Sequence, residues 1–108
     1  MENNFVFLGT ELKLNLHIEP IKDLTMKDYD FTVEAYCSSR KSLVLKKVGS
    51  NIKELDSNNY ILLIDTAEVG PGILKCKVTA LLPDTDFKDN IRTEVSIIDT
   101  GIEIIKSI

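Results

Sequence analysis

Apolar and polar side chains alternate along much of the chain, which is the pattern of half-buried β-strands. In residues 11–18, leucine or isoleucine takes every second position, and Lys13, Asn15 and His17 are among the residues between them. Such a segment places one face on a core and the other in water. Similar patterns predict further strands at residues 30–37, 42–48 and 74–80.

Residues 60–64 are apolar at every position, which predicts a strand covered on both faces or a central place in its sheet. A short connection carrying Gly70, Pro71 and Gly72 follows before the strand at 74–80. The chain must turn there, because glycine permits unusual backbone angles and proline cannot donate to a strand ladder. After a loop at 83–90, we expect strands at about 92–98 and 102–105, separated by a turn at 99–101.

Short strands with turn signals at a spacing of roughly ten residues predict an all-β sandwich of about seven strands. With 108 residues, the chain has room for one domain, so we expect residues 1–108 to form a single unit. Residues 21–28 are expected to form at most one helical turn.

Charge and hydropathy exclude several classes of partner. The net charge of −4 is spread over interspersed residues of both signs, whereas nucleic-acid binding needs clustered lysine and arginine. The apolar run at 60–64 is far short of the ~20 residues of a membrane helix, and the N-terminus lacks the features of a signal peptide. We therefore expect no nucleic acid, no membrane and no export.

No combination of residues predicts an enzyme. Nucleophilic catalysis needs a serine, cysteine or threonine beside a base, but His17 is the only histidine and lies on the polar face of its strand. Cys37 and Cys76 are expected to face the core instead. Two cysteines and one distant histidine do not have the spacing of a zinc site. We therefore expect neither catalysis nor a cofactor.

The acidic loop at 83–90 leaves two interpretations open. Asp84, Asp86 and Asp89 have the oxygen ligands that calcium prefers, although the loop lacks the glycine of an EF-hand. Alternatively, the loop is a solvated turn capped by aspartate side chains.

The two ends of the chain carry the strongest sign of a partner. An apolar tetrapeptide precedes the first alternating strand, and isoleucines are concentrated near the C-terminus. Either these segments are edge strands that complete the two sheets, or they bind a neighbouring subunit. On the second interpretation, residues 1–10 form a partner-binding arm, and the partner-binding residues are Phe5, Val6, Phe7, Leu8, Ile102, Ile104, Ile105 and Ile108.

Cys37 and Cys76 fall on two inward-facing strand positions, which resembles the paired cysteines of an immunoglobulin-type sandwich. The segment 68–76 resembles the corner that precedes the second cysteine in such domains. The chain has no tryptophan, and Leu74 stands where the family has its corner tyrosine. The resemblance implies an immunoglobulin-like antiparallel β-sandwich, with the cysteines either bonded or present as free, buried thiols.

A second resemblance covers nearly the whole chain and is carried by strand and turn motifs. These are GTELKL at 9–14, MKDYDF at 26–31, YILLIDT at 60–66, GPGIL at 70–74, ALLPD at 80–84 and RTE at 92–94. The chain resembles small β-sandwich proteins of tailed, crAss-like bacteriophages and prophages of Bacteroidales.

This resemblance implies a non-enzymatic structural protein of the virion, present in the host cytoplasm during assembly. It would be a head decoration or a head or tail adaptor that binds capsid, fibre or tail proteins or further copies of itself. The alternative is a binding module for a host-surface glycan or protein, with Tyr29, Tyr36 or Phe87 making the contacts.

Overall fold

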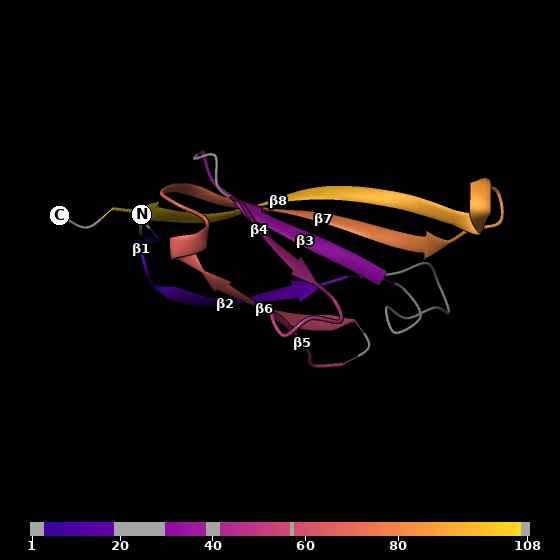
Figure 1. Cartoon of the computed structure of the whole chain (residues 1–108), viewed down its shortest axis with the longest axis horizontal. Coiled ribbons are helices and arrows are strands. Elements are labelled where there is room, and N and C mark those ends of the chain that lie inside the picture. Colours follow the sequence, from indigo (N-terminus) through magenta and orange to yellow (C-terminus); the bar gives the residue numbers. More distant parts are fainter. Residues whose placement is uncertain (1–3, 19–29, 39–41, 57, 107–108) are drawn as a thin grey trace.

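The computed structural model describes residues 4–18, 30–38, 42–56 and 58–106, and these form two stacked β-sheets (Figure 1). All neighbouring strands are antiparallel except β1 and β8, which are parallel. The expected all-β sandwich is therefore confirmed. The five-stranded sheet has the order β1 (Phe5–Phe7), β8 (Ile91–Ile105), β7 (Gly72–Pro83), β3 (Asp30–Tyr36), β4 (Ser42–Lys46), and the three-stranded sheet has the order β2 (Glu11–His17), β6 (Asn59–Asp65), β5 (Ile52–Glu54).

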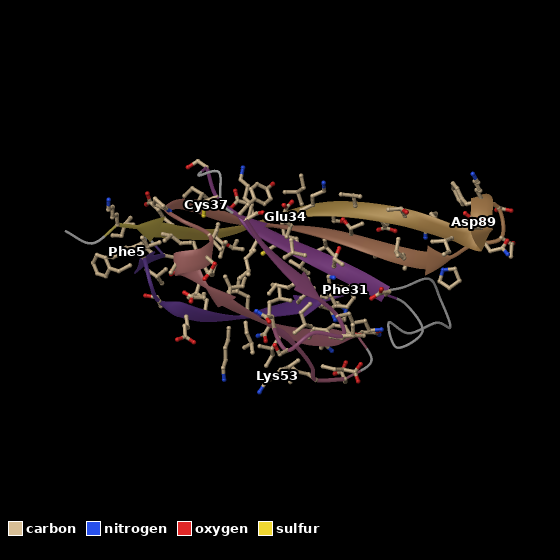
Figure 2. The ribbon with its side chains drawn as sticks, in the orientation of Figure 1. Phe5, Phe31, Glu34, Cys37, Lys53 and Asp89 are labelled. Atoms are coloured by element: carbon tan, nitrogen blue, oxygen red, sulfur yellow. The ribbon has the colours of Figure 1, made fainter. Side chains whose placement is uncertain are left out.

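The core lies between the sheets and is made by the alternate positions that the sequence predicts. Phe31 of β3 and Tyr60 of β6 meet there edge to face, with ring centroids 4.9 Å apart. Figure 2 shows Phe31 directed from its strand toward the other sheet. The central place expected for residues 60–64 is confirmed, because β6 lies between β2 and β5. On β7, the inward residues are Leu74, Cys76, Val78, Ala80 and Leu82.

The chain passes from one sheet to the other through the connection between β6 and β7. A short 3-10 helix, η2 (Thr66–Glu68), begins there with the Asp65 carboxylate accepting from the Ala67 N–H. Thr66 is fully buried, and its hydroxyl accepts from the Gly9 N–H and donates to the Thr10 carbonyl, each at 2.8 Å. In this chain a threonine therefore ties the corner to the segment before β2.

The turn expected at 99–101 is wrong, because residues 91–105 form one strand with a bulge. The register with β7 shifts between Ile73 and Lys75. There the Thr100 hydroxyl donates to the Leu74 carbonyl at 2.8 Å, and the Gly101 N–H donates to the Asp99 carboxylate. These hydrogen bonds pair polar groups of the extra residues in the bulge, so the strand bends there but does not reverse its direction.

Other differences from the predicted elements are smaller. Strand β5 carries no alternating pattern long enough to be recognised, and it adds to the expected number of strands. The helical turn expected at 21–28 lies outside the described residues.

The immunoglobulin-type placement of the two cysteines is also wrong. Cys37 directly follows β3, and β3 pairs with β7 in the same sheet, where Ala35 lies opposite Cys76. The cysteine pair of an immunoglobulin domain joins the two sheets instead. Both cysteines here are buried and free. Alternation predicted correctly that both face inward, but it does not tell which sheet a strand joins.

Candidate interaction surface

The structure brings the two apolar end segments together. Strand β1 lies parallel to the last part of β8, with Phe5 opposite Glu103, Val6 opposite Ile104 and Phe7 opposite Ile105. The Leu8 N–H continues the ladder by donating to the Ile105 carbonyl at 2.8 Å. The interpretation as an edge strand is therefore confirmed for the N-terminal segment, whereas the C-terminal segment lies inside the same sheet, between β7 and β1.

Only some of the predicted partner-binding residues reach the surface. Val6, Leu8 and Ile104 pack on or in the core, and Ile104 is only 1% exposed. Phe5 and Phe7 point to the outer face of the sheet, are each about half exposed, and meet edge to face with ring centroids 5.9 Å apart. Figure 2 shows Phe5 projecting from one end of the molecule. Ile102 and Ile105 are half-buried, and Ile108 lies outside the described residues.

The β7–β8 hairpin carries a second set of exposed apolar residues, which the sequence analysis missed. In Figure 1 the hairpin runs past the smaller sheet toward the opposite end of the molecule from β1. Val95 and Ile97 are 52% and 62% exposed on its outer face, where β-branched side chains would ordinarily be covered. We call the exposed residues Leu81, Ile91, Val95 and Ile97 the hairpin patch.

The alternation along β8 gave no warning of this exposure. In the segment 91–98, Ile91, Val95 and Ile97 share one face, whereas Arg92, Glu94 and Ser96 share the other, so alternation predicts that the apolar face is buried. The strand is exposed on nearly every residue from Ile91 to Asp99. The apolar face of this segment therefore lies on the outside of the sheet, which is the opposite of what its alternation predicts.

A groove of about 320 Å³ opens beneath the hairpin, between β8 and the end of β2. Its walls are mostly apolar, with a few polar groups at the edge. His17 borders it, with its Nδ1 2.8 Å from the Asn59 Oδ1. The lining residues are Leu16, His17, Ile18, Val78, Ala80, Glu94, Ser96 and Ile98.

The acidic loop at 83–90 forms the tip of the β7–β8 hairpin, where Asp84 makes local polar contacts. The Asp84 carboxylate accepts from the Asp86 N–H at 3.0 Å and lies 3.3 Å from the Arg92 Nε. The interpretation as an aspartate-capped turn is therefore confirmed for Asp84. Within the described ranges, no three acidic, histidine or cysteine side chains gather as metal ligands.

The groups considered for nucleophilic chemistry lie in different environments. His17 is exposed on the three-stranded sheet, whereas both cysteines are buried in the five-stranded sheet. Burial raises the pKa of the Cys76 thiol to about 11, and the nearby Cys37 adds to the shift. Burial likewise raises the pKa of Cys37. Neither thiol is activated as a nucleophile, because activation requires a lowered pKa.

The aromatic residues expected to bind a glycan are not brought together. Phe87 is about half exposed at the hairpin tip. Tyr36 is half-buried opposite Lys75, near the other end of β7, and Tyr29 lies outside the described residues. A stacking platform needs aromatic rings on one surface, so this arrangement does not supply one.

Comparisons with protein-family models, with curated proteins and with solved structures found no match to this chain. In the part of the chain that the structure describes, no helix has the length and apolar character needed to cross a membrane.

Proposed function

We propose that this protein is a non-enzymatic structural protein that binds other proteins through the outer face of its five-stranded sheet. The observation that carries the proposal is the long exposed apolar strand β8, with Val95 and Ile97 more than half exposed. Exposed apolar residues that cluster on one face mark interaction sites more often than isolated ones do.

The same face carries Phe5 and Phe7, so apolar side chains are available near both ends of the sheet. Between them lie charged residues, and Lys77 of β7 stands opposite both Glu34 and Ile97. An apolar surface divided by charges is typical of interfaces that also exist exposed to water. The resemblance to bacteriophage β-sandwich proteins suggests the setting, which is a head decoration or a head or tail adaptor of a virion.

Mass spectrometry of purified phage particles tests the setting, and the proposal predicts the protein among the particle components. A binding test then uses the F5S/F7S variant and the V95S/I97S variant with disassembled particle proteins. We expect each to weaken binding about tenfold or more, because buried apolar side chains dominate interface energies. The V48S variant is the control, since Val48 is 90% exposed in the turn between β4 and β5 and belongs to neither set of surface residues. Undiminished binding by both surface variants would contradict the proposal.

A further inference from the structure

Most of strand β8 has a free edge. On one side it pairs with β7, and on the other β1 covers only Glu103 to Ile105. Among the described strands, none pairs with the outer edge of residues 91–99. Free edges are commonly protected by lysine, proline, a bulge or inward-pointing charges. The segment 91–98 contains neither lysine nor proline, its register with β7 is regular, and its inward charges, Arg92 and Glu94, are paired with each other.

The backbone groups on this edge can be assigned. The Asp84 N–H donates to the Asn90 carbonyl at 2.9 Å, and Pro83, which has no N–H, lies opposite Ile91. Antiparallel ladders alternate between pairs that exchange hydrogen bonds and pairs that do not. The N–H and C=O groups of the odd-numbered residues therefore point outward, and these are Ile91, Thr93, Val95 and Ile97.

The side chains of this edge are complementary to themselves. If a second copy pairs antiparallel with Thr93 opposite Thr93, then Arg92 lies opposite Glu94 and Ile91 opposite Val95, each twice by symmetry. Arg92 and Glu94 then form non-hydrogen-bonded pairs, in which facing side chains come closest. Opposite charges, β-branched residues and facing threonines are all favourable cross-strand pairs.

Neighbouring registers lack this match. An axis through Glu94 places that carboxylate opposite its own copy, which is repulsive. An axis through Val95 places Arg92 opposite Ile98 and Glu94 opposite Ser96, so neither of these charges faces an opposite charge.

The geometry within one copy already prepares the charged pair. Arg92 Nη1 lies 3.0 Å from the Glu94 Oε2, and its Nε lies 3.3 Å from the Asp84 Oδ2. The guanidinium is therefore held along the inner face of β8, while the Glu94 side chain remains 54% exposed. A carboxylate accepts several hydrogen bonds, so Glu94 has capacity for a second arginine.

We infer that two copies of this chain associate edge to edge through residues 91–95 of β8, antiparallel and with Thr93 on the two-fold axis. The five-stranded sheets then form one sheet that is continuous across both copies. Strand β1 stays outside the contact, because it pairs beyond the bulge at the other end of β8. This self-association goes beyond the proposed binding of other proteins.

Charge reversal tests the register. R92E and E94R each place like charges opposite one another twice, so each alone should raise the dimer dissociation constant at least about tenfold in analytical ultracentrifugation. An equimolar mixture of the two variants restores both opposite-charge pairs, and the double variant R92E/E94R restores them within one protein. We expect dimers in both cases, which also shows that the single variants still fold.

Cross-linking tests the axis. In a hydrogen-bonded antiparallel pair, facing Cα atoms are about 5.5 Å apart, a distance that a disulfide spans. T93C should therefore form a covalent dimer under mild oxidation, faster than V95C. A monomeric wild-type chain at high micromolar concentration, or a mixture of R92E and E94R that stays monomeric while the wild-type chain dimerises, would overturn the inference. Loss of F5S/F7S binding to particle proteins is a separate result, because those residues lie outside this contact.

Discussion

The two halves of strand β8 differ in what covers them. Residues 102–105 lie between β7 and β1, and Ile104 is part of the core. Residues 91–99 pair with β7 alone and are exposed on nearly every side chain, although they too carry isoleucine and valine, at Ile91, Val95, Ile97 and Ile98. The presence of such residues therefore does not decide which half is covered; the bulge at 99–102 and the short length of β1 do.

The largest difference between the halves should appear on truncation of one isoleucine in each. Replacing Ile104 with alanine removes a side chain that is 1% exposed, and we expect a loss of about 2–5 kcal/mol in the free energy of unfolding. Ile97 is 62% exposed, so its replacement with alanine should change the free energy of unfolding by no more than about 0.5 kcal/mol. Chemical denaturation of both variants under conditions that keep the chain monomeric measures the contrast. Equal losses would contradict the assignment of one half to the core.

Two glycines sharpen the comparison at the point where the covered half begins. Gly72 has a φ of +129°, and an added Cβ would lie 2.6 Å from the Ser38 Oγ and 3.0 Å from the Cys37 Cβ. We expect G72A to lower the free energy of unfolding by about 2–3 kcal/mol, because the strain of the backbone and the overpacking of the new Cβ add together.

The control is G101A in the bulge, which also has a positive φ but has nothing within 4 Å of the added Cβ. G101A should lower the free energy of unfolding by about 1–2 kcal/mol, because only the strain of an alanine in the left-handed backbone conformation contributes. Thermal unfolding followed by circular dichroism measures both variants. A G101A loss as large as that of G72A would show that the contact with residues 37 and 38 does not matter.

A smaller effect is expected from pH. Burial raises the pKa of the Cys76 thiol in the folded state to about 11, from an ordinary value of 9.0. The unfolded chain therefore loses this proton first, and the folded chain binds more protons between these two values. Stability should be fully present below pH 9 and fall as the pH rises toward 11.

The C76A variant provides the comparison, because it removes this ionisation. Its midpoint of urea denaturation should fall less steeply over the same pH window. Slopes as steep as those of the wild-type chain would assign the alkaline loss of stability to other groups.

The smallest effect concerns the ion pair at the hairpin tip. D84N removes the carboxylate charge that faces Arg92, and the pair is only partly buried. We expect a loss of about 0.2–1 kcal/mol, which shrinks further as salt is added. T85A in the same loop is the control, because no described interaction involves the Thr85 side chain. A salt-independent loss would mean that the cap on the Asp86 N–H, and not the charge, is responsible.

Much of the fold was predictable because alternation reports directly on a half-buried strand. The faces of β3 and β7 were predicted residue by residue, including Cys37 and Cys76. Strand β5 was not, since three residues are too few to show a period. The single strand β8 was not, since Asp99, Thr100 and Gly101 have the composition of a turn.

The candidate surface was predictable only in part. Phe5 and Phe7 stood out as members of a run of four apolar residues, and they are exposed. Val95 and Ile97 did not, because they lie on the apolar face of an alternating strand, and such a face normally packs on the core. Their exposure depends on the sheet order, which leaves the second side of β8 open and which no local pattern encodes.

The parallel pairing of Phe5 with Glu103 also has a consequence for synthesis. Strand β1 leaves the ribosome before any other described strand, but its partner is made after nearly all the rest of the chain. Closing so long a loop is slow, because the entropy of the intervening chain must be lost before the contact forms. Through most of translation the apolar segment from Phe5 to Leu8 therefore lacks its partner strand, and a chaperone that binds nascent chains would have access to it.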